Sequence, residues 1–503
     1  METNFSKRTW TFLWICLILL NVIIRIPITP HEIGHDSFLL HFIADSLSTY
    51  GHAKWWLNPL SMIGLYPHSE ASALPFYLSG ISQVLSLVME NAIWVALLLL
   101  GVFSSFTAYF MAGAIKDDKF FKFITAFIYS TAPGILVFTT WSASGRGMFL
   151  VLLPLFIYFL IKSRFSIKYG IMAVVFWILL LATHNLVYLT GPIILGFCIA
   201  LVISKVQVKS SNLYGGIILL ILFIIFLIQL SVKHFSLFNL ILSFVRYTGV
   251  LIVFTIGGFV YLLFKKNRTF EENFLILALL FLTPIMSVVL YSKYFMIPFE
   301  ALLASYGIMN LIKISRTKKH IILLIILFFS LSVGVAEFYQ FGRTNADYEN
   351  SATPFYAEDS IVNAALWTKS YTTEMMMTDE FLVSRRMLAY SGANLITENN
   401  IATLIQGNLW SFNISNRSPF STLFYSEGPY QIENPKGMTD WLWYKLRDQG
   451  YYGSWKEVIF NRFDIYYYIR DERYATGFSI TFDGKSGKLY DNGKNTIWYL
   501  KNI

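Results

Sequence analysis

Long apolar stretches recur along the first two thirds of the chain, separated by short polar and basic connections. Each is close to the length of about 20 residues with which a helix crosses the hydrocarbon core of a bilayer. The pattern predicts a polytopic α-helical membrane protein with about 11–13 transmembrane helices. The expected spans lie near residues 10–28, 92–115, 123–140, 148–161, 169–184, 187–204, 215–232, 245–264, 274–291, 294–312 and 321–338.

The N-terminal region contains three features of its own. The first apolar run follows Lys7 and Arg8, lacks a small-residue cleavage site and keeps Arg25 near its end, which indicates a retained span rather than a signal peptide. Residues 75–89 are apolar but short for a crossing, so we expect a re-entrant or interfacial helix; if they do cross, the number of spans changes. Residues 29–74 form a long external loop, and loops of this length are usually functional.

After residue 338 the spans stop, charge rises and short alternating segments appear. Alternation over 463–470, and two short segments flanking Asn492-Gly493, predict strands and a terminal hairpin. A helix is expected over 357–369. The chain should therefore divide into a membrane domain, 1–338, and an extracytoplasmic α+β domain, 339–503. Two glycosylation sequons, at Asn413 and Asn416, fall in the second part.

Composition and charge agree with a membrane protein and fix an orientation. The chain of 503 residues is 55% hydrophobic and only 14% charged, against roughly 25% charged in soluble domains. Its net charge is +9, and its Lys and Arg residues cluster in alternate short loops. This is the distribution that the positive-inside rule expects of cytoplasmic loops, so the charge need not indicate nucleic-acid binding. We expect a multi-pass plasma-membrane protein of the cell envelope, with a cytoplasmic N-terminus. Both cysteines, Cys16 and Cys198, lie in predicted spans and indicate no disulfide framework.

The stretch HEIGH, residues 31–35, has the spacing of a zinc-protease helix. On a helix, His31 and His35 would share one face with Glu32 beside them as a base. The longer metzincin pattern needs a glycine where Phe38 stands, and no later span carries the aspartate that an intramembrane protease uses as third ligand. Pro30 and a glycine at 34 are also typical of a helix start rather than its middle. A membrane zinc metalloprotease stays as the alternative enzyme.

The same loop, taken whole, resembles the first external loop of the GT-C glycosyltransferases. Asp36 follows the first span, and Tyr66-Pro67 stands at the turn into the next apolar segment. Downstream, residues 130–133 and 141–147 are similar to the family's second external loop, and 293–298 to the opening of a late span. The family includes the oligosaccharyltransferase catalytic subunit, protein O-mannosyltransferases and aminoarabinose transferases. The resemblance implies a GT-C-like membrane domain with an external active site.

The resemblance implies transfer of a hexose or pentose from a polyprenyl-phosphate donor to a hydroxyl of a glycan, lipid or protein acceptor, beside membrane lipids and without nucleic acid. Such a transfer needs a base for the acceptor proton, and Asp36 is the candidate. It also needs positive charge at the departing phosphate, for which Arg146 and Lys293 are candidates. No cofactor is certain; if a divalent Mg or Mn ion is used, Asp36 and Glu32 are its candidate ligands. The candidate supporting residues are Glu32, His35 and His184.

Several departures and alternatives stay open. The second external loop carries Arg146 and no acid, and Asp440-Trp-Leu-Trp-Tyr444 is not the WWDYG motif of the oligosaccharyltransferase, so single-sugar transfer fits better than en-bloc transfer to asparagine. Asp36 and His184 could be helix caps, and Lys293 could be a membrane anchor. A transporter, or a non-catalytic membrane scaffold, is the interpretation from another class, although no repeat symmetry is evident.

Overall fold

The computed structural model describes twelve stretches of the chain: 6–51, 73–206, 237–287, 292–315, 317–344, 354–378, 381–393, 395–396, 414–416, 430–432, 465–473 and 486–500. The chain forms two compact units. The helical unit comprises Met1–Ile26, Leu97–Thr140 and Arg146–Gly342. The mixed unit comprises Pro27–Ala96, Trp141–Gly145 and Arg343–Ile503. The predicted division at 338/339 concerns membrane embedding and stays a prediction; by compactness, the loop after the first helix groups with the C-terminal region.

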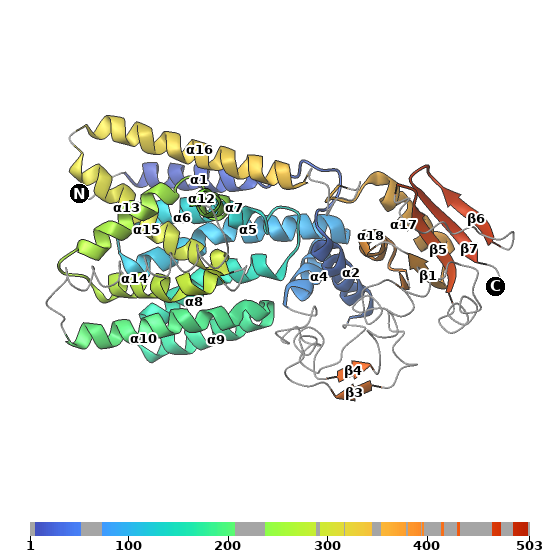
Figure 1. Cartoon of the computed structure of the whole chain (residues 1–503), viewed down its shortest axis with the longest axis horizontal. Coiled ribbons are helices and arrows are strands. Elements are labelled where there is room, and N and C mark those ends of the chain that lie inside the picture. Colours follow the sequence, from blue (N-terminus) through green and yellow to red (C-terminus); the bar gives the residue numbers. More distant parts are fainter. Residues whose placement is uncertain are drawn as a thin grey trace. The chain divides into compact units, whose positions relative to one another are not determined.

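The helical unit is built from apolar helices (Figure 1). Among the described residues, five helices are long and apolar enough to cross a membrane: Met89–Ile115, Gly145–Lys162, Leu186–Ser204, Lys293–Ile314 and Lys319–Gly342. The polytopic membrane prediction is thus confirmed, while the predicted span at 215–232 lies outside the described residues. The elements are α1 (Lys7–Ile23), α5 (Met89–Ile115), α6 (Lys119–Ser130), α7 (Pro133–Leu136), α8 (Gly145–Lys162), α9 (Ile167–Thr183), η1 (Asn185–Leu189), α10 (Thr190–Val206), α12 (Leu237–Thr248), α13 (Ile252–Phe264), α14 (Phe270–Leu282), η2 (Thr283–Ser287), α15 (Ser292–Ile314) and α16 (Lys318–Thr344).

Two predicted spans are each split into two helices. The span expected at 123–140 ends as α6 at Ser130, because Pro133 holds Ala132 in an extended conformation before α7 begins. The span expected at 245–264 is divided into α12 and α13 at Gly249, whose φ of +87° does not belong to a right-handed helix. These single-helix predictions were wrong because hydropathy does not register local backbone breaks.

Helices α13 and α15 approach with their backbones in contact. A Cβ atom added to Gly258 would lie 1.9 Å from the carbonyl oxygen of Leu303, and one added to Gly307 would lie 2.1 Å from that of Phe254. Small residues permit such approaches between apolar helices, where packing rather than hydrophobic burial supplies the attraction.

The end of the first helix is fixed by a buried cation. Arg25 is fully buried and donates to the side-chain oxygen of Asn21 at 2.7 Å, the carbonyl of Ser130 at 2.9 Å and the hydroxyl of Thr139 at 3.0 Å. Gly101 makes room, because a Cβ there would lie 1.9 Å from the guanidinium Nε. A buried arginine with this set of acceptors sets where the chain leaves α1.

The mixed unit packs helices beside a small sheet (Figure 1). The five-stranded sheet has the order β2-β1-β5-β7-β6, with β1 parallel to β2 and β5 and the other pairs antiparallel. Two short strands, β3 and β4, form a separate antiparallel pair. The elements are α2 (His35–Tyr50), α4 (Ala73–Leu85), α17 (Asp359–Tyr371), β1 (Met375–Thr378), α18 (Phe381–Ser391), β2 (Leu395–Ile396), β3 (Ile414–Asn416), β4 (Tyr430–Ile432), β5 (Ile465–Asp471), β6 (Ser486–Asp491) and β7 (Asn495–Leu500).

The local predictions for this region are confirmed. The hairpin forms between β6 and β7, with Gly493 at a φ of +84° in its turn, and β5 covers the alternating segment. The expected helix over 357–369 is α17. The short apolar segment expected over 75–89 forms the helix α4, which ends at Leu85, and its re-entrant or interfacial placement stays a prediction.

One apolar core joins the early loop to the C-terminal sheet. Phe38 and Ile43 of α2, Leu388 of α18, Ile469 of β5 and Ile497 of β7 are all fully buried in it. The chain just after the first helix is therefore part of the same core as strands more than 400 residues later.

Candidate active site

Residues 31–33 run as an extended segment before α2. Ile33 forms an isolated antiparallel bridge with Tyr356, and its N–H donates to the carbonyl of Trp141 at 3.0 Å. The N–H of Gly34 donates to the carbonyl of Phe355 at 3.0 Å. Main-chain bonds on both sides thus fix the chain immediately before α2.

The HEIGH stretch is not a helix. Gly34 has a φ of +91°, and a Cβ there would lie 3.0 Å from the hydroxyl of Ser142, so this position favours glycine. Helix α2 begins only at His35, which leaves His31 and Glu32 in the extended segment. The zinc-protease alternative requires one helical face through residues 31–35, and this prediction of a helix is wrong. The side chain of His35 lies outside the described residues.

Asp36 lies in the first turn of α2, with 52% of its side chain exposed. The N-terminal turn of a helix favours a carboxylate, because its unbonded N–H groups carry partial positive charge. The guanidinium Nη1 of Arg385, on α18, is 3.5 Å from Asp36 Oδ1. The candidate base is thus an exposed acid on a helix that is anchored in the core.

The same unit contains a buried acid–imidazole pair. The Glu32 side chain is fully buried, and its Oε1 is 2.9 Å from Nδ1 of His41. The hydroxyl of Ser37 is 3.4 Å from the other carboxylate oxygen and accepts from the N–H of Ala143 at 2.8 Å. Burial raises the pKa of Glu32. Burial lowers the pKa of the His41 imidazolium, but the Glu32 carboxylate outweighs it, so the net shift is upward.

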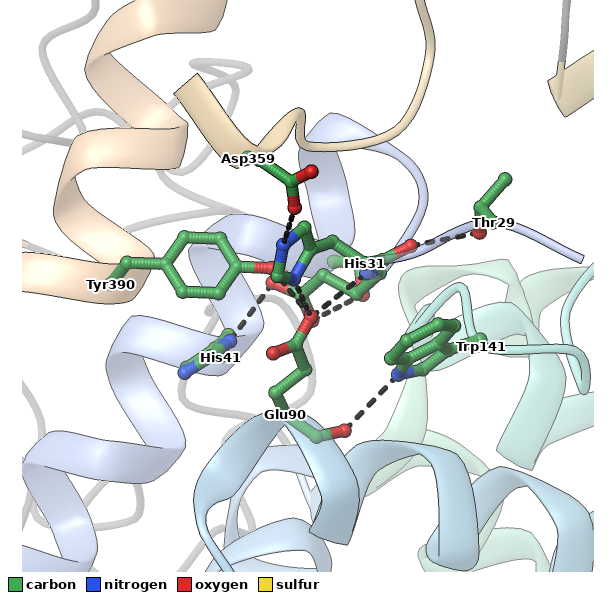
Figure 2. A network of polar contacts seen from close by, with 9 residues as sticks. Thr29, His31, His41, Glu90, Trp141, Asp359 and Tyr390 are labelled. Atoms are coloured by element: carbon green, nitrogen blue, oxygen red, sulfur yellow. Dashed lines mark hydrogen bonds and ion pairs between the residues drawn. The ribbon is translucent and has the colours of Figure 1, made fainter. Parts of the chain in front are cut away.

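His31 lies between two acids (Figure 2). Its Nδ1 is 3.0 Å from Glu90 Oε1, and its Nε2 is 3.0 Å from Oδ1 of Asp359. The same oxygen of Glu90 accepts from the N–H of Glu32 at 3.1 Å and the hydroxyl of Tyr390 at 2.9 Å. The hydrogen bond to Glu90 raises the pKa of His31, which burial opposes. This network lies within the mixed unit, because Glu90 is on the first turn of α5, which belongs to that unit up to Ala96, and it connects the segment before α2 to this turn, α17 and α18.

Sequence reasoning missed Glu90, Asp359, Tyr390 and Arg385. Glu90 offers a weak local signal, since an acid at the start of an apolar span is unusual. The other three belong to the C-terminal region, and their partners are 300 or more positions away in the chain. No pattern local to the sequence connects them.

The other candidates belong to the helical unit. Arg146, in the first turn of α8, places its guanidinium 5.6 Å from the ring centre of Phe138. Lys293, near the start of α15, has its Nζ 5.8 Å from the ring centre of Tyr247. His184 follows α9 and accepts from the N–H of Leu186 at 3.1 Å, which is a capping contact. Tyr66-Pro67 on the first loop, Asn413, and the segment from Asp440 to Tyr444 lie outside the described residues.

The site residues do not fit a divalent ion shared by Asp36 and Glu32. Within the described stretches, no group of three or more His, Cys, Asp and Glu side chains could hold a metal. The Glu32 carboxylate is buried against His41 and Ser37, whereas Asp36 is exposed beside Arg385. The Glu32 carboxylate therefore faces the inside of the unit, away from solvent.

Neither protein-family models nor curated protein sequences match the chain. Several solved structures, in contrast, match the chain over most of its length. The Archaeoglobus fulgidus oligosaccharyltransferase, in a complex with Zn and sulfate, matches with a TM-score of 0.60 at 13% identity, over 92% of this chain and 68% of that one. ArnT from Cupriavidus metallidurans, bound to undecaprenyl phosphate, matches with a TM-score of 0.56 at 9% identity, over 99% of both chains.

A third match is the mycobacterial arabinofuranosyltransferase AftD, with a TM-score of 0.55 at 11% identity over 99% of this chain and 42% of that one. Identities this low establish a shared fold and leave the reaction open. The three neighbours are GT-C glycosyltransferases, and two of them are matched over more than two thirds of both chains. With its apolar helices, its acid after the first of them and its C-terminal sheet, this chain has the GT-C fold, as its sequence predicted.

Proposed function

We propose that the chain is an integral membrane glycosyltransferase that moves one sugar from a polyprenyl-phosphate donor to an acceptor hydroxyl, with Asp36 as general base. The observation that carries the proposal is the position of Asp36: an exposed acid, at the start of a core-anchored helix, directly after the first helix of a GT-C fold. The donor class is supported by the polyprenyl phosphates in two neighbours, undecaprenyl phosphate in ArnT and dolichol phosphate in the archaeal AglB.

The proposed reaction is a single displacement at the anomeric carbon. The acceptor oxygen forms a bond to C1 of the sugar while the bond from C1 to the phosphate oxygen breaks, which inverts the configuration at C1. The polyprenyl phosphate leaves with the electron pair of that bond. The acceptor proton passes to the Asp36 carboxylate and then to solvent. A base of this kind contributes about 10²–10⁴-fold to the rate.

The leaving phosphate needs positive charge. Arg146 and Lys293 are proposed for this role on their charge and on the orientation predicted from the loops. In the same orientation the N-terminus is cytoplasmic, and the mixed unit with Asp36 is external. The supporting roles of Glu32, His35 and His184 belong to the proposal as positioning of the loop and helix ends.

The test is sugar transfer by the purified full-length chain in lipid. The donors are undecaprenyl phosphates that carry radiolabelled hexoses or pentoses, with membrane extract as the source of acceptor, and the readouts are labelled product and released undecaprenyl phosphate. Asp36→Asn should lower turnover by about 10²-fold or more. Asp45→Asn, a change of the same kind on the same helix, is the matched control and should stay close to wild type. Full activity in Asp36→Asn would remove the base assignment; no transfer from any donor would remove the proposed function.

A further inference from the structure

Arg385 is a cation that the C-terminal region contributes beside the proposed base. Its side chain is only 9% exposed, yet its Nη1 is 3.5 Å from an oxygen of Asp36, which is half exposed. A guanidinium this buried is costly unless an anion or carbonyl groups compensate its charge. The buried cation beside an exposed acid distinguishes this pair from an ordinary surface ion pair.

The helix that carries Arg385 is firmly held. Met387 and Leu388 of α18 are fully buried in the core shared with α2. The adjacent Arg386 is also buried, donates to the carbonyl of Pro354 at 2.5 Å, and lies with its guanidinium 5.8 Å from the ring centre of Phe38. Phe38 follows Asp36 by two residues on α2. The two arginines thus connect α18 to the first turn of α2 at two successive positions.

We infer that Arg385 is a positioning residue for Asp36: it holds the carboxylate in the orientation from which an oxygen can accept the acceptor proton. The inference rests on the proposed function. At 3.5 Å the contact is longer than the ~2.7–2.9 Å of a tight charge-assisted hydrogen bond, so it orients the acid by charge more than by a short bond. Arg385 lies after the last candidate membrane helix of the described residues, so the C-terminal region completes the geometry of a base that the first loop provides.

A positioning role and a phosphate-binding role have different kinetics. If Arg385 orients Asp36, its loss reduces the chemical step and leaves donor binding intact, so kcat falls and the KM for the donor stays constant. If Arg385 instead bound the donor phosphate, the KM for the donor would rise. A misplacement of about 1 Å at a catalytic group is worth up to about 10²-fold in rate.

The experiment compares Arg385→Gln and Arg385→Lys with wild type, using the same undecaprenyl-phosphate donors. We expect kcat to fall about tenfold to hundredfold in Arg385→Gln, with the donor KM within about twofold, and to be partly restored by the charge in Arg385→Lys. Lys369→Gln removes one positive charge from an exposed position on α17 and is the matched control. Wild-type kcat in both Arg385 variants, or a raised donor KM at unchanged kcat, would overturn the inference.

A double-mutant cycle separates positioning from general destabilisation. Asp36→Glu moves the carboxylate, so the further loss caused by Arg385→Gln should be smaller in that background than in wild type. Equal losses in both backgrounds would mean that Arg385 acts independently of Asp36. If Arg385→Gln fails to fold, Arg385→Lys provides the same cycle. An inactive Asp36→Asn beside fully active Arg385 variants would refute this inference alone, whereas a fully active Asp36→Asn would remove the base assignment itself.

Discussion

The buried pair of Glu32 and His41 should respond to mutation in opposite ways at two pH values. Glu32 is fully buried, and His41 is its closest partner at 2.9 Å. His41→Leu removes the imidazole and leaves a buried carboxyl group. Glu32→Gln keeps the shape of the acid and leaves a buried imidazole that no longer faces a charge. Because the two remaining groups titrate in different ranges, their costs depend on pH in opposite directions.

The magnitudes follow from the ordinary pKa values. At pH 7 a lone buried Glu32 becomes neutral only by taking up a proton, which with a pKa of about 4.3 costs roughly 3.7 kcal/mol. A lone His41, with an ordinary pKa of about 6.5, is neutral at pH 7 at almost no cost. At pH 5 the cost falls to roughly 1 kcal/mol for Glu32 and rises to roughly 2 kcal/mol for His41. The difference in free energy of unfolding between His41→Leu and Glu32→Gln should therefore change by roughly 4–5 kcal/mol between pH 7 and pH 5.

The assay is thermal unfolding of the purified chain, followed by tryptophan fluorescence at both pH values. A change of 1 kcal/mol shifts the Tm of a unit of 150–250 residues by roughly 2–4 °C, so His41→Leu should lie roughly 7–15 °C below wild type at pH 7. The Tm of Glu32→Gln should be close to that of wild type at pH 7 and clearly below that of wild type at pH 5. A difference in Tm between the two variants that is the same at pH 7 and pH 5 would refute the pairing of Glu32 with His41.

Three further outcomes follow from the structure. His31→Ala should destabilise most below about pH 6.5 and progressively less as the pH rises further, because the raised pKa of His31 contributes stability that is lost as pH rises through the folded-state value; a constant difference in Tm would contradict this. Gly34→Ala should cost about 1–3 kcal/mol by thermal unfolding, whereas Gly80→Ala, whose Cβ meets open space, should not destabilise; equal shifts would rule out backbone strain. Gly258→Ala should reduce the yield of folded protein, since its Cβ would meet backbone at 1.9 Å, and its neighbour Gly257→Ala should not; equal yields would refute the close helix contact.

Patterns local to the sequence predicted much of the fold. Apolar length predicted the membrane helices, and Asn492-Gly493 predicted the terminal hairpin, because each of these elements is determined by neighbours a few residues away. The breaks at Gly249 and Pro133 were missed, since a hydropathy average hides single-residue backbone changes. Gly34 carried a local signal of a helix start, and the structure shows that it excludes the metal-binding helix.

The surroundings of the site could not be predicted from the sequence. Arg385 lies 349 positions from Asp36 along the chain, and Tyr390 lies 300 positions from Glu90. Arg385 and Asp36 lie on helices α18 and α2, which share one core with the sheet, and a single sequence carries no local trace of either pair. The sequence could select Asp36 because its place after the first span resembles that of the acidic residue in the first external loop of GT-C glycosyltransferases, but its partner required the fold.

The central claim is that Asp36 removes the acceptor proton, and the ratio of kcat between wild type and Asp36→Asn tests it most directly. Release of undecaprenyl phosphate, coupled to labelled product, should fall about 10²–10⁴-fold in Asp36→Asn, while the donor KM stays close to wild type. An Asp36→Asn chain that turns over donor at the wild-type rate would contradict the account.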